Sequence, residues 1–176
     1  GNVDNLVYSV MNAFYIACSS FVGQNYGAGK PRRVLKSYLF TLGFSALAAA
    51  VLGGLFLLFG HQFLSLFTPE ADVIEAGLAR MWVMCFSFPI SALMDCTTAA
   101  SRGLGKGLVP MVFVFLGSCV FRVVWVYTVF AYFHTIRSLY MLYSFSWILT
   151  GTAEIAYFVY CYKKYVKPLD TSPAAE

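Results

Sequence analysis

Long apolar segments alternate with short polar gaps along most of the chain. A helix that crosses a bilayer needs about 20 predominantly apolar residues, and about five segments reach that length. We therefore predict that residues 1–166 form a bundle of transmembrane helices. The polar residues 167–176, which include Pro168 and Pro173, are predicted to form a disordered cytoplasmic tail. The predicted spans are residues 3–22, 34–59, 74–101, 108–133 and 139–162.

The composition agrees with a protein whose solvent is a bilayer. Hydrophobic residues make up 60% of the 176 residues and charged residues only 11%, whereas ordinary soluble domains carry about a quarter charged residues. We therefore predict an all-α integral membrane protein. The five cysteines lie in apolar segments and are expected to be buried hydrophobes. His61 and His134 lie far from other ligand types, so neither a metal site nor a cofactor is expected.

The gaps between the predicted spans are short and most contain Gly or Pro, and every second gap is basic. The first is FVGQNYGAGKPRR, Phe21 to Arg33, where Gly23 is expected to end one span and Pro31 to begin the next. Short cytoplasmic loops are enriched in Lys and Arg, and the alternate gaps offer one clear basic residue, Arg137. We therefore predict an outside N-terminus and a cytoplasmic C-terminus. The predicted cytoplasmic residues are Lys30, Arg32, Arg33, Lys36, Arg102, Lys106, Lys163, Lys164 and Lys167.

A phosphate-binding loop is another interpretation of this first glycine-rich gap. Such a loop has a Gly five positions before its Gly-Lys pair and a Ser or Thr after it. Those places hold Gln24 and Pro31, and no strand pattern precedes them. The segment is therefore predicted to be a tight cytoplasmic turn. Its motif residues are Gly23, Gln24, Asn25, Gly27, Ala28 and Gly29.

Three ionisable residues, Asp95, Arg122 and Glu154, lie inside predicted spans. A charge in the bilayer costs at least a few kcal/mol, so each is a functional candidate. At about 1.5 Å per residue, Asp95 and Glu154 lie roughly 10 and 14 Å from their cytoplasmic ends, and Arg122 roughly 20 Å. Asp95 and Glu154 are candidates for coupling a cation or proton, and Arg122 is their candidate charge partner. The alternative is structural, an ion pair or a hydrogen bond, and it is favoured for Glu154 and Arg122.

Polar residues recur at spacings of three and four along the first predicted span, which places them on one helix face. A polar face on a membrane helix is expected to line water, a substrate or another polar helix. Helix packing through side-chain hydrogen bonds is the alternative. The residues of this face are Asn5, Tyr8, Asn12, Tyr15 and Ser19, of which the first four are candidates for lining a cavity.

Two further patterns concern helix shape and packing. Pro89, inside the third predicted span, removes one backbone hydrogen bond and is expected to bend that helix. In the second span Ala46, Ala50 and Gly54 recur every four residues, which favours close helix packing. A bend at Pro89 would suit a protein whose spans rearrange, although many such bends are static.

Three segments in this order resemble the C-terminal lobe of the multidrug and toxic compound extrusion (MATE) family. They are FVGQNYGAGKPRR, SRGLGKGLVPM and GSCVFRVVWVYTVF. The resemblance implies a twelve-helix secondary transporter built from two six-helix lobes. Such a transporter exports organic, often cationic compounds in exchange for sodium ions or protons. The five predicted spans resemble the eighth to twelfth helices, so the first lobe and the seventh helix would be partners outside this sequence.

The resemblance also implies roles for individual residues. Many family members carry a cation-binding carboxylate in the tenth helix, upstream of an Arg-Gly turn that matches Arg102 and Gly103. Asp95 is the acid in the inner part of that span, about one helical turn closer to the Arg-Gly turn than in the sodium-coupled pattern. Tyr8, Asn12 and Tyr15 look like cavity-facing residues of the eighth helix.

Two other functions remain open at this stage. One is a lipid-linked sugar flippase of the same superfamily, although such proteins lack the Gly-Gln-Asn-x-Gly-Ala turn. The other is a truncated, non-transporting membrane scaffold. Enzymatic activity is not expected, because no nucleophile, base and metal ligands converge at one depth. The resemblance implies a multi-pass protein of the plasma membrane, in contact with lipid and small organic substrates and not with nucleic acid.

Overall fold

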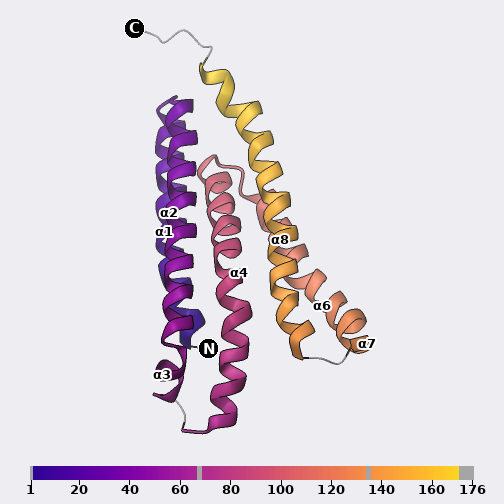
Figure 1. The fold of residues 1–176 in the computed structure, drawn as a ribbon. Coiled ribbons are helices and arrows are strands. Elements are labelled where there is room, and N and C mark those ends of the chain that lie inside the picture. The colour runs from indigo at the N-terminus through magenta and orange to yellow at the C-terminus, as the bar shows by residue number, and fades with distance from the viewer. Residues whose placement is uncertain (1, 67–68, 134–135, 171–176) are drawn as a thin grey trace.

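The computed structural model describes the backbone of residues 2–66, 69–133 and 136–170, and all regular structure in these ranges is helical (Figure 1). The side chains of residues 5–66, 69–132 and 142–169 are described. The helices are α1 (Asn2–Gly27), α2 (Pro31–Leu58), α3 (Gly60–Ser65), α4 (Ala71–Gly103), α5 (Leu108–Phe115), η1 (Leu116–Val120), α6 (Phe121–Trp125), η2 (Val126–Phe130), α7 (Ala131–Phe133), α8 (Ile136–Cys161), η3 (Tyr162–Val166) and η4 (Lys167–Asp170).

Helix α4 lies at the centre of the bundle. It packs against α1 and α2 on one side and against α8 on the other, while the rod formed by α5, η1, α6, η2 and α7 leans away (Figure 1). Its buried face includes Phe88, Ala92, Cys96 and Ala99, which join the apolar clusters formed with the neighbouring helices. The arrangement buries one stripe of each helix and leaves large apolar side chains exposed elsewhere, as expected for lipid-facing surfaces.

The described residues contain four helical runs that are long and apolar enough to cross a bilayer: Asn5–Gly27, Pro31–Leu58, Ala71–Gly103 and Leu108–Phe130. The all-helical membrane fold predicted from the sequence is therefore confirmed. The predicted fifth span corresponds to α8, whose 26 residues are about 39 Å long at 1.5 Å per residue. That length exceeds the bilayer core of about 30 Å, and α8 as a fifth span stays a prediction.

The first span does not end at Gly23, which corrects the sequence prediction. Helix α1 continues to Gly27, and the turn is confined to the next three residues. Gly29 has a φ of 64°, and the Lys30 N–H donates to Asn25 O over 3.0 Å. This is the Schellman arrangement, in which a left-handed glycine follows the helix and the freed carbonyls are satisfied. Pro31 begins α2 as predicted.

Helix α4 ends in the same way as α1. Gly105 has a φ of 73°, and the Lys106 N–H donates to Ser101 O over 3.0 Å. The two turns share the sequence Gly-x-Gly-Lys, at residues 27–30 and 103–106. In each, only the second glycine has a positive φ, so the pattern itself encodes the helix stop.

Pro89 lies inside α4 without interrupting it, and the bend expected there stays a prediction. Proline has no N–H, so the helical hydrogen bond from residue 89 to Cys85 O cannot form. Gly53 of α2 lies directly against this carbonyl: a Cβ placed on Gly53 would be 3.1 Å from Cys85 O. The proline therefore coincides with the place where α2 and α4 approach most closely through a glycine backbone.

Four of the five cysteines are buried as predicted, but Cys119 is exposed. Cys119 lies in η1, on the rod that leans away from α4, and this position leaves its side chain exposed (Figure 1). At the other end of the chain, part of the segment predicted to be a disordered tail is helical. Lys167–Asp170 form a turn of 3-10 helix, and residues 171–176 lie outside the described residues.

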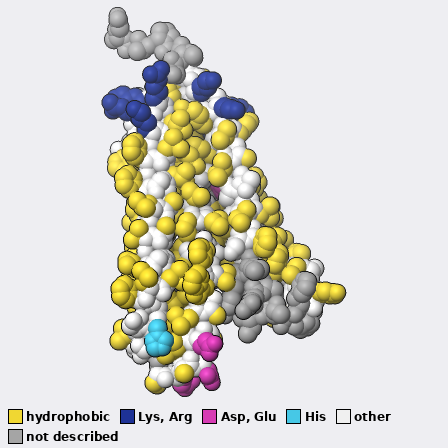
Figure 2. Space-filling model, in the orientation of Figure 1, with side chains coloured by type: hydrophobic (Ala, Val, Ile, Leu, Met, Phe, Trp, Pro, Cys, Tyr) yellow, Lys and Arg dark blue, Asp and Glu magenta, His cyan; other side chains and the backbone are white. Residues whose placement is uncertain are grey.

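Basic and acidic side chains occupy opposite ends of the bundle on the face shown in Figure 2. At the basic end, Tyr162 Oη donates to Pro31 O over 3.4 Å, and Lys106 Nζ lies 4.4 Å from the centroid of the Tyr165 ring. These contacts bring together η3, the start of α2 and the turn before α5. Three segments that are distant in sequence thus meet at the basic end.

Candidate functional site

A hollow of about 350 Å³ lies between α1 and α4, lined by Tyr8, Met11, Asn12, Tyr15 and Asp95. Three of the four residues predicted from the polar face of the first span are therefore brought together with the predicted carboxylate. The fourth, Asn5, is exposed and does not line this hollow. Tyr8, Asn12 and Tyr15 meet there because they lie three or four residues apart on α1.

Helix α4 positions the Asp95 carboxylate at the wall of the hollow. Asp95 is half-buried, and Ser91, one turn earlier, donates to Asp95 Oδ2 over 3.4 Å. This distance is long for a hydroxyl donor, so the carboxylate keeps most of its capacity to accept other bonds. Sequence inspection missed Ser91, although its position four residues before Asp95 was the available signal. On the α1 side, Tyr8 packs edge-on against Phe88 with ring centroids 6.3 Å apart.

A cation–aromatic contact lies on the basic side of the hollow. The Arg102 guanidinium carbon is 5.8 Å from the centroid of the Tyr15 ring. Arg102 is seven residues after Asp95, which is two helical turns or about 10 Å along α4. Tyr15 therefore belongs both to the hollow and to a link with the Arg-Gly turn at the end of α4.

Glu154 lies in a different place, inside the interface between α8 and α4. Its side chain is fully buried, and neither carboxyl oxygen has a hydrogen-bond partner among the described residues. Thr150 Oγ1, one turn earlier on α8, and Ser101 Oγ on α4 are also buried without partners. Glu154 does not line the hollow with Asp95. The predicted acids thus occupy separate environments, one open and one enclosed.

Arg122 does not pair with either acid among the described residues. Its guanidinium carbon lies 4.5 Å from the centroid of the Tyr143 ring on α8, and its Nε is buried without a partner. This contact links the leaning rod to α8 through a cation and an aromatic face. The arrangement gives Arg122 a packing contact in place of the charge partnership expected from the sequence.

The residues of the glycine-rich turn motif hold α1 to its neighbours. Asn25 Nδ2 donates to Phe21 O over 2.8 Å and to Ser37 Oγ over 3.1 Å, which joins α1 to α2. Gln24 Nε2 donates to Ser20 Oγ over 3.0 Å on the same helix. The Asn25–Ser37 bond of the motif therefore links α1 to α2. Within the described residues, no cluster of three or more His, Cys, Asp or Glu side chains is arranged to hold a metal ion.

Comparison with known proteins places this architecture in one family. The MatE family model matches residues 1–128. The probable multidrug resistance protein NorM of Idiomarina loihiensis (strain ATCC BAA-735 / DSM 15497 / L2-TR) is 27% identical over 115 residues, covering 65% of this chain and 25% of the relative.

A solved structure has the same fold. It is described as the inward-facing conformation of a multidrug resistance MATE family transporter of the MOP superfamily, and it matches with a TM-score of 0.74 at 18% identity. The match covers 98% of this chain and 39% of that chain. The chain therefore spans well under half the length of the proteins it resembles. With the family model matching most of its length, the chain belongs to the MatE family of membrane transporters.

Proposed function

We propose that the chain is part of a multidrug efflux transporter that exports organic, often cationic compounds in exchange for sodium ions or protons. The observation that carries this proposal is the hollow between α1 and α4, where Tyr8 and Tyr15 lie beside the Asp95 carboxylate. Aromatic rings and a carboxylate are the groups that attract an organic cation. NorM and the structural relative are each described by their names as multidrug resistance proteins, which supports the same function.

The proposed mechanism is competition for one negative charge. An organic cation and a coupling cation or proton each neutralise Asp95, so binding of one favours release of the other. Alternating access requires that this exchange shift the balance between inward-open and outward-open states. The Tyr15 ring contacts both the hollow and Arg102, so it is suited to pass a change at Asp95 to the turn that ends α4.

Asp95 is preferred over Glu154 as the coupling residue because of access. The Asp95 carboxylate lines a hollow that an ion can enter, whereas Glu154 is fully buried between helices. Glu154 is the second candidate, because a buried carboxyl group without a partner is costly unless it binds a proton or cation.

The proposed working unit is larger than this chain. A first six-helix lobe and a seventh helix would complete the translocation path, in keeping with the 39% of the structural relative that the chain covers. We further propose a plasma-membrane location, with the basic end of Figure 2 in the cytoplasm. That orientation places the start of α1 outside and the end of α8 inside.

The test is export of a fluorescent organic cation from cells that express the full-length protein, with sodium and proton gradients imposed separately. Asp95→Asn is expected to abolish gradient-driven export while the protein still reaches the membrane. Asp72→Asn is the matched control, because Asp72 is an exposed acid in the first turn of the same helix. Normal export by Asp95→Asn would contradict the assignment, and absence of export by the unaltered protein would contradict the function.

A further inference from the structure

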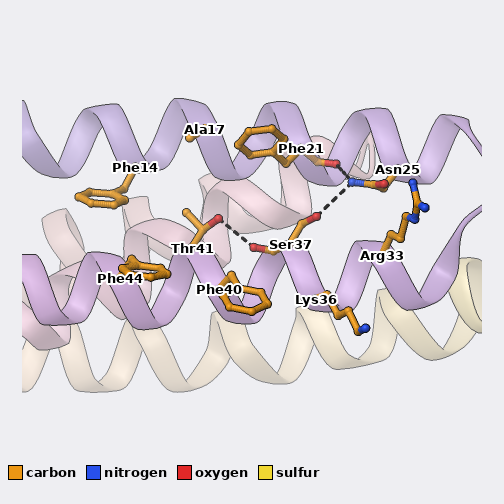
Figure 3. Close-up of a pocket in the computed structure, with 10 residues that line it drawn as sticks. All are labelled: Phe14, Ala17, Phe21, Asn25, Arg33, Lys36, Ser37, Phe40, Thr41 and Phe44. Carbon is orange, nitrogen blue, oxygen red and sulfur yellow. Dashed lines mark hydrogen bonds between the residues drawn. The ribbon is translucent and has the colours of Figure 1, made fainter.

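A second hollow, of about 430 Å³, runs along the outer side of the α1–α2 pair (Figure 3). We call it the outer groove. Four phenylalanines, Phe14, Phe21, Phe40 and Phe44, form its apolar part, and Arg33 and Lys36 lie at one end. The rings of Phe14 and Phe21 come from α1 and those of Phe40 and Phe44 from α2, and the two cations lie at the end where α2 begins (Figure 3). The outer groove is therefore amphipathic along its length.

The apolar part of the outer groove remains open in the structure. Phe21, Phe40 and Phe44 are 53%, 64% and 58% exposed. Phe40 and Phe44 stack with centroids 6.4 Å apart. A smaller hollow of about 170 Å³ lies on the other side of these two rings, next to Gly43. The outer groove and this smaller hollow, which we call the smaller track, therefore share the Phe40–Phe44 pair.

The charged end has no counterion in the part of the chain that the structure describes. Neither Arg33 nor Lys36 makes an ion pair with any described residue, and no acid lines the outer groove. The polar groups beside them, Asn25 and Ser37, already bond to one another over 3.1 Å. Two exposed cations therefore face the same space, and a ligand with negative charge would neutralise both.

The separation between the cations and the aromatic rings along α2 matches the separation between the phosphate and the acyl chains of a phospholipid. Lys36 and Phe44 are eight residues apart, which is about 12 Å along a helix. The two cations lie at the end of the outer groove where α2 begins, and the rings lie farther along the helices (Figure 3). With the basic end at a membrane surface, the cations would lie at headgroup level and the rings in the hydrocarbon region. A phospholipid has this same order of groups, with a charged phosphate at the surface and two acyl chains below it.

We propose that the outer groove binds one anionic phospholipid, with its phosphate on Arg33 and Lys36 and its two chains on either side of the Phe40–Phe44 pair. Basic pockets between helices at a cytoplasmic surface are suited to anionic lipid headgroups. The exported organic cation is not suited to this site, because two positive charges would repel it, whereas the Asp95 hollow attracts it. The inference rests on the membrane location of the family and is independent of drug export.

The test is lipid binding by the purified full-length protein in detergent, measured by native mass spectrometry with phosphatidylglycerol and phosphatidylcholine as probes. The unaltered protein is expected to retain phosphatidylglycerol in preference. Arg33→Gln with Lys36→Gln is expected to lower that preference roughly tenfold to thirtyfold, because each surface cation contributes to the attraction. Lys30→Gln with Lys163→Gln is the control, since it removes two charges from the same end outside the outer groove.

A second variant tests the acyl-chain part without changing any charge. A side chain added at Gly43 meets nothing within 4 Å, so Gly43→Phe is expected to fill the smaller track and weaken retention of both probe lipids. Inorganic phosphate in place of lipid is expected not to compete, because it lacks the chains.

Three results would overturn the inference: an unchanged preference in the Arg33 and Lys36 variant, an equal loss in the control, or no retained lipid because protein fills the groove. Binding is measured without transport, so an inactive transporter that keeps the lipid preference contradicts only the proposed function. A working transporter without that preference contradicts only the lipid site.

Discussion

Gly23 of α1 and Gly103 of α4 pack backbone against backbone at the basic end of the bundle. A Cβ on Gly103 would lie 2.6 Å from Ser19 O and 3.1 Å from Gly23 N, and a Cβ on Gly23 would lie 3.2 Å from Gly103 O. The glycines of two separate turn motifs thus meet. This contact explains why Gly23 lies inside a helix that continues past it.

Gly103→Ala is therefore expected to destabilise the protein by about 1–3 kcal/mol, as overpacking of a tight contact does. The nearest atoms belong to the backbone of α1 and cannot rotate away. Gly54→Ala is the control, because nothing lies within 4 Å of its added Cβ and a helical Gly→Ala change stabilises by up to about 1 kcal/mol. Thermal unfolding in detergent would compare them, and equal midpoints would contradict the close-packing explanation.

The Asn25–Ser37 hydrogen bond is expected to couple α1 and α2 energetically. Hydrogen bonds between membrane helices average about 0.6 kcal/mol and reach about 1.7 kcal/mol. A double-mutant cycle of Asn25→Ala and Ser37→Ala, measured by equilibrium unfolding in mixed detergent micelles, should give a coupling free energy in this range. Gln24→Ala with Ser37→Ala serves as the control pair, because Gln24 bonds to Ser20 on its own helix. A coupling of zero for the first pair would show that the bond does not form in the membrane.

Tyr15 is expected to affect the affinity for an organic cation through its ring. Tyr15→Ala should lower that affinity roughly 2-fold to 30-fold, which corresponds to one cation–aromatic contact. Tyr15→Phe keeps the ring and should retain most of the affinity. Binding of a fluorescent cation to the purified full-length protein would measure both. Equal losses in the two variants would assign the effect to the hydroxyl group and contradict this expectation.

Glu154 offers a test of which acid couples transport. Because its carboxyl oxygens lack hydrogen-bond partners among the described residues, Glu154→Met is expected to leave stability unchanged or raise it by up to about 3 kcal/mol. Glu154→Gln should keep gradient-driven export if Asp95 is the coupling residue. Export and thermal unfolding would be measured on the same preparations. A stable Glu154→Gln protein that has lost export would assign coupling to Glu154.

Sequence pattern alone predicted the parts of this protein that depend on local chemistry. Apolar length predicted the four described helical runs that can cross a bilayer, and Pro31 predicted the start of α2 because proline suits the first turn of a helix. Spacings of three and four predicted that Tyr8, Asn12 and Tyr15 share a face. Each of these features depends on residues within a few positions of one another, so the one-dimensional pattern contains the information.

Tertiary structure decided which of these local features meet. Gly23 appeared to be a helix stop until α4 placed Gly103 against it, because a close approach and a turn both use glycine. Likewise, the sequence placed Asp95 and Glu154 at similar depths, but the packing of the helices places one at an open hollow and the other in a closed interface. Composition and spacing predict helices and their faces, and the packing of α4 against its neighbours decides which faces form a site.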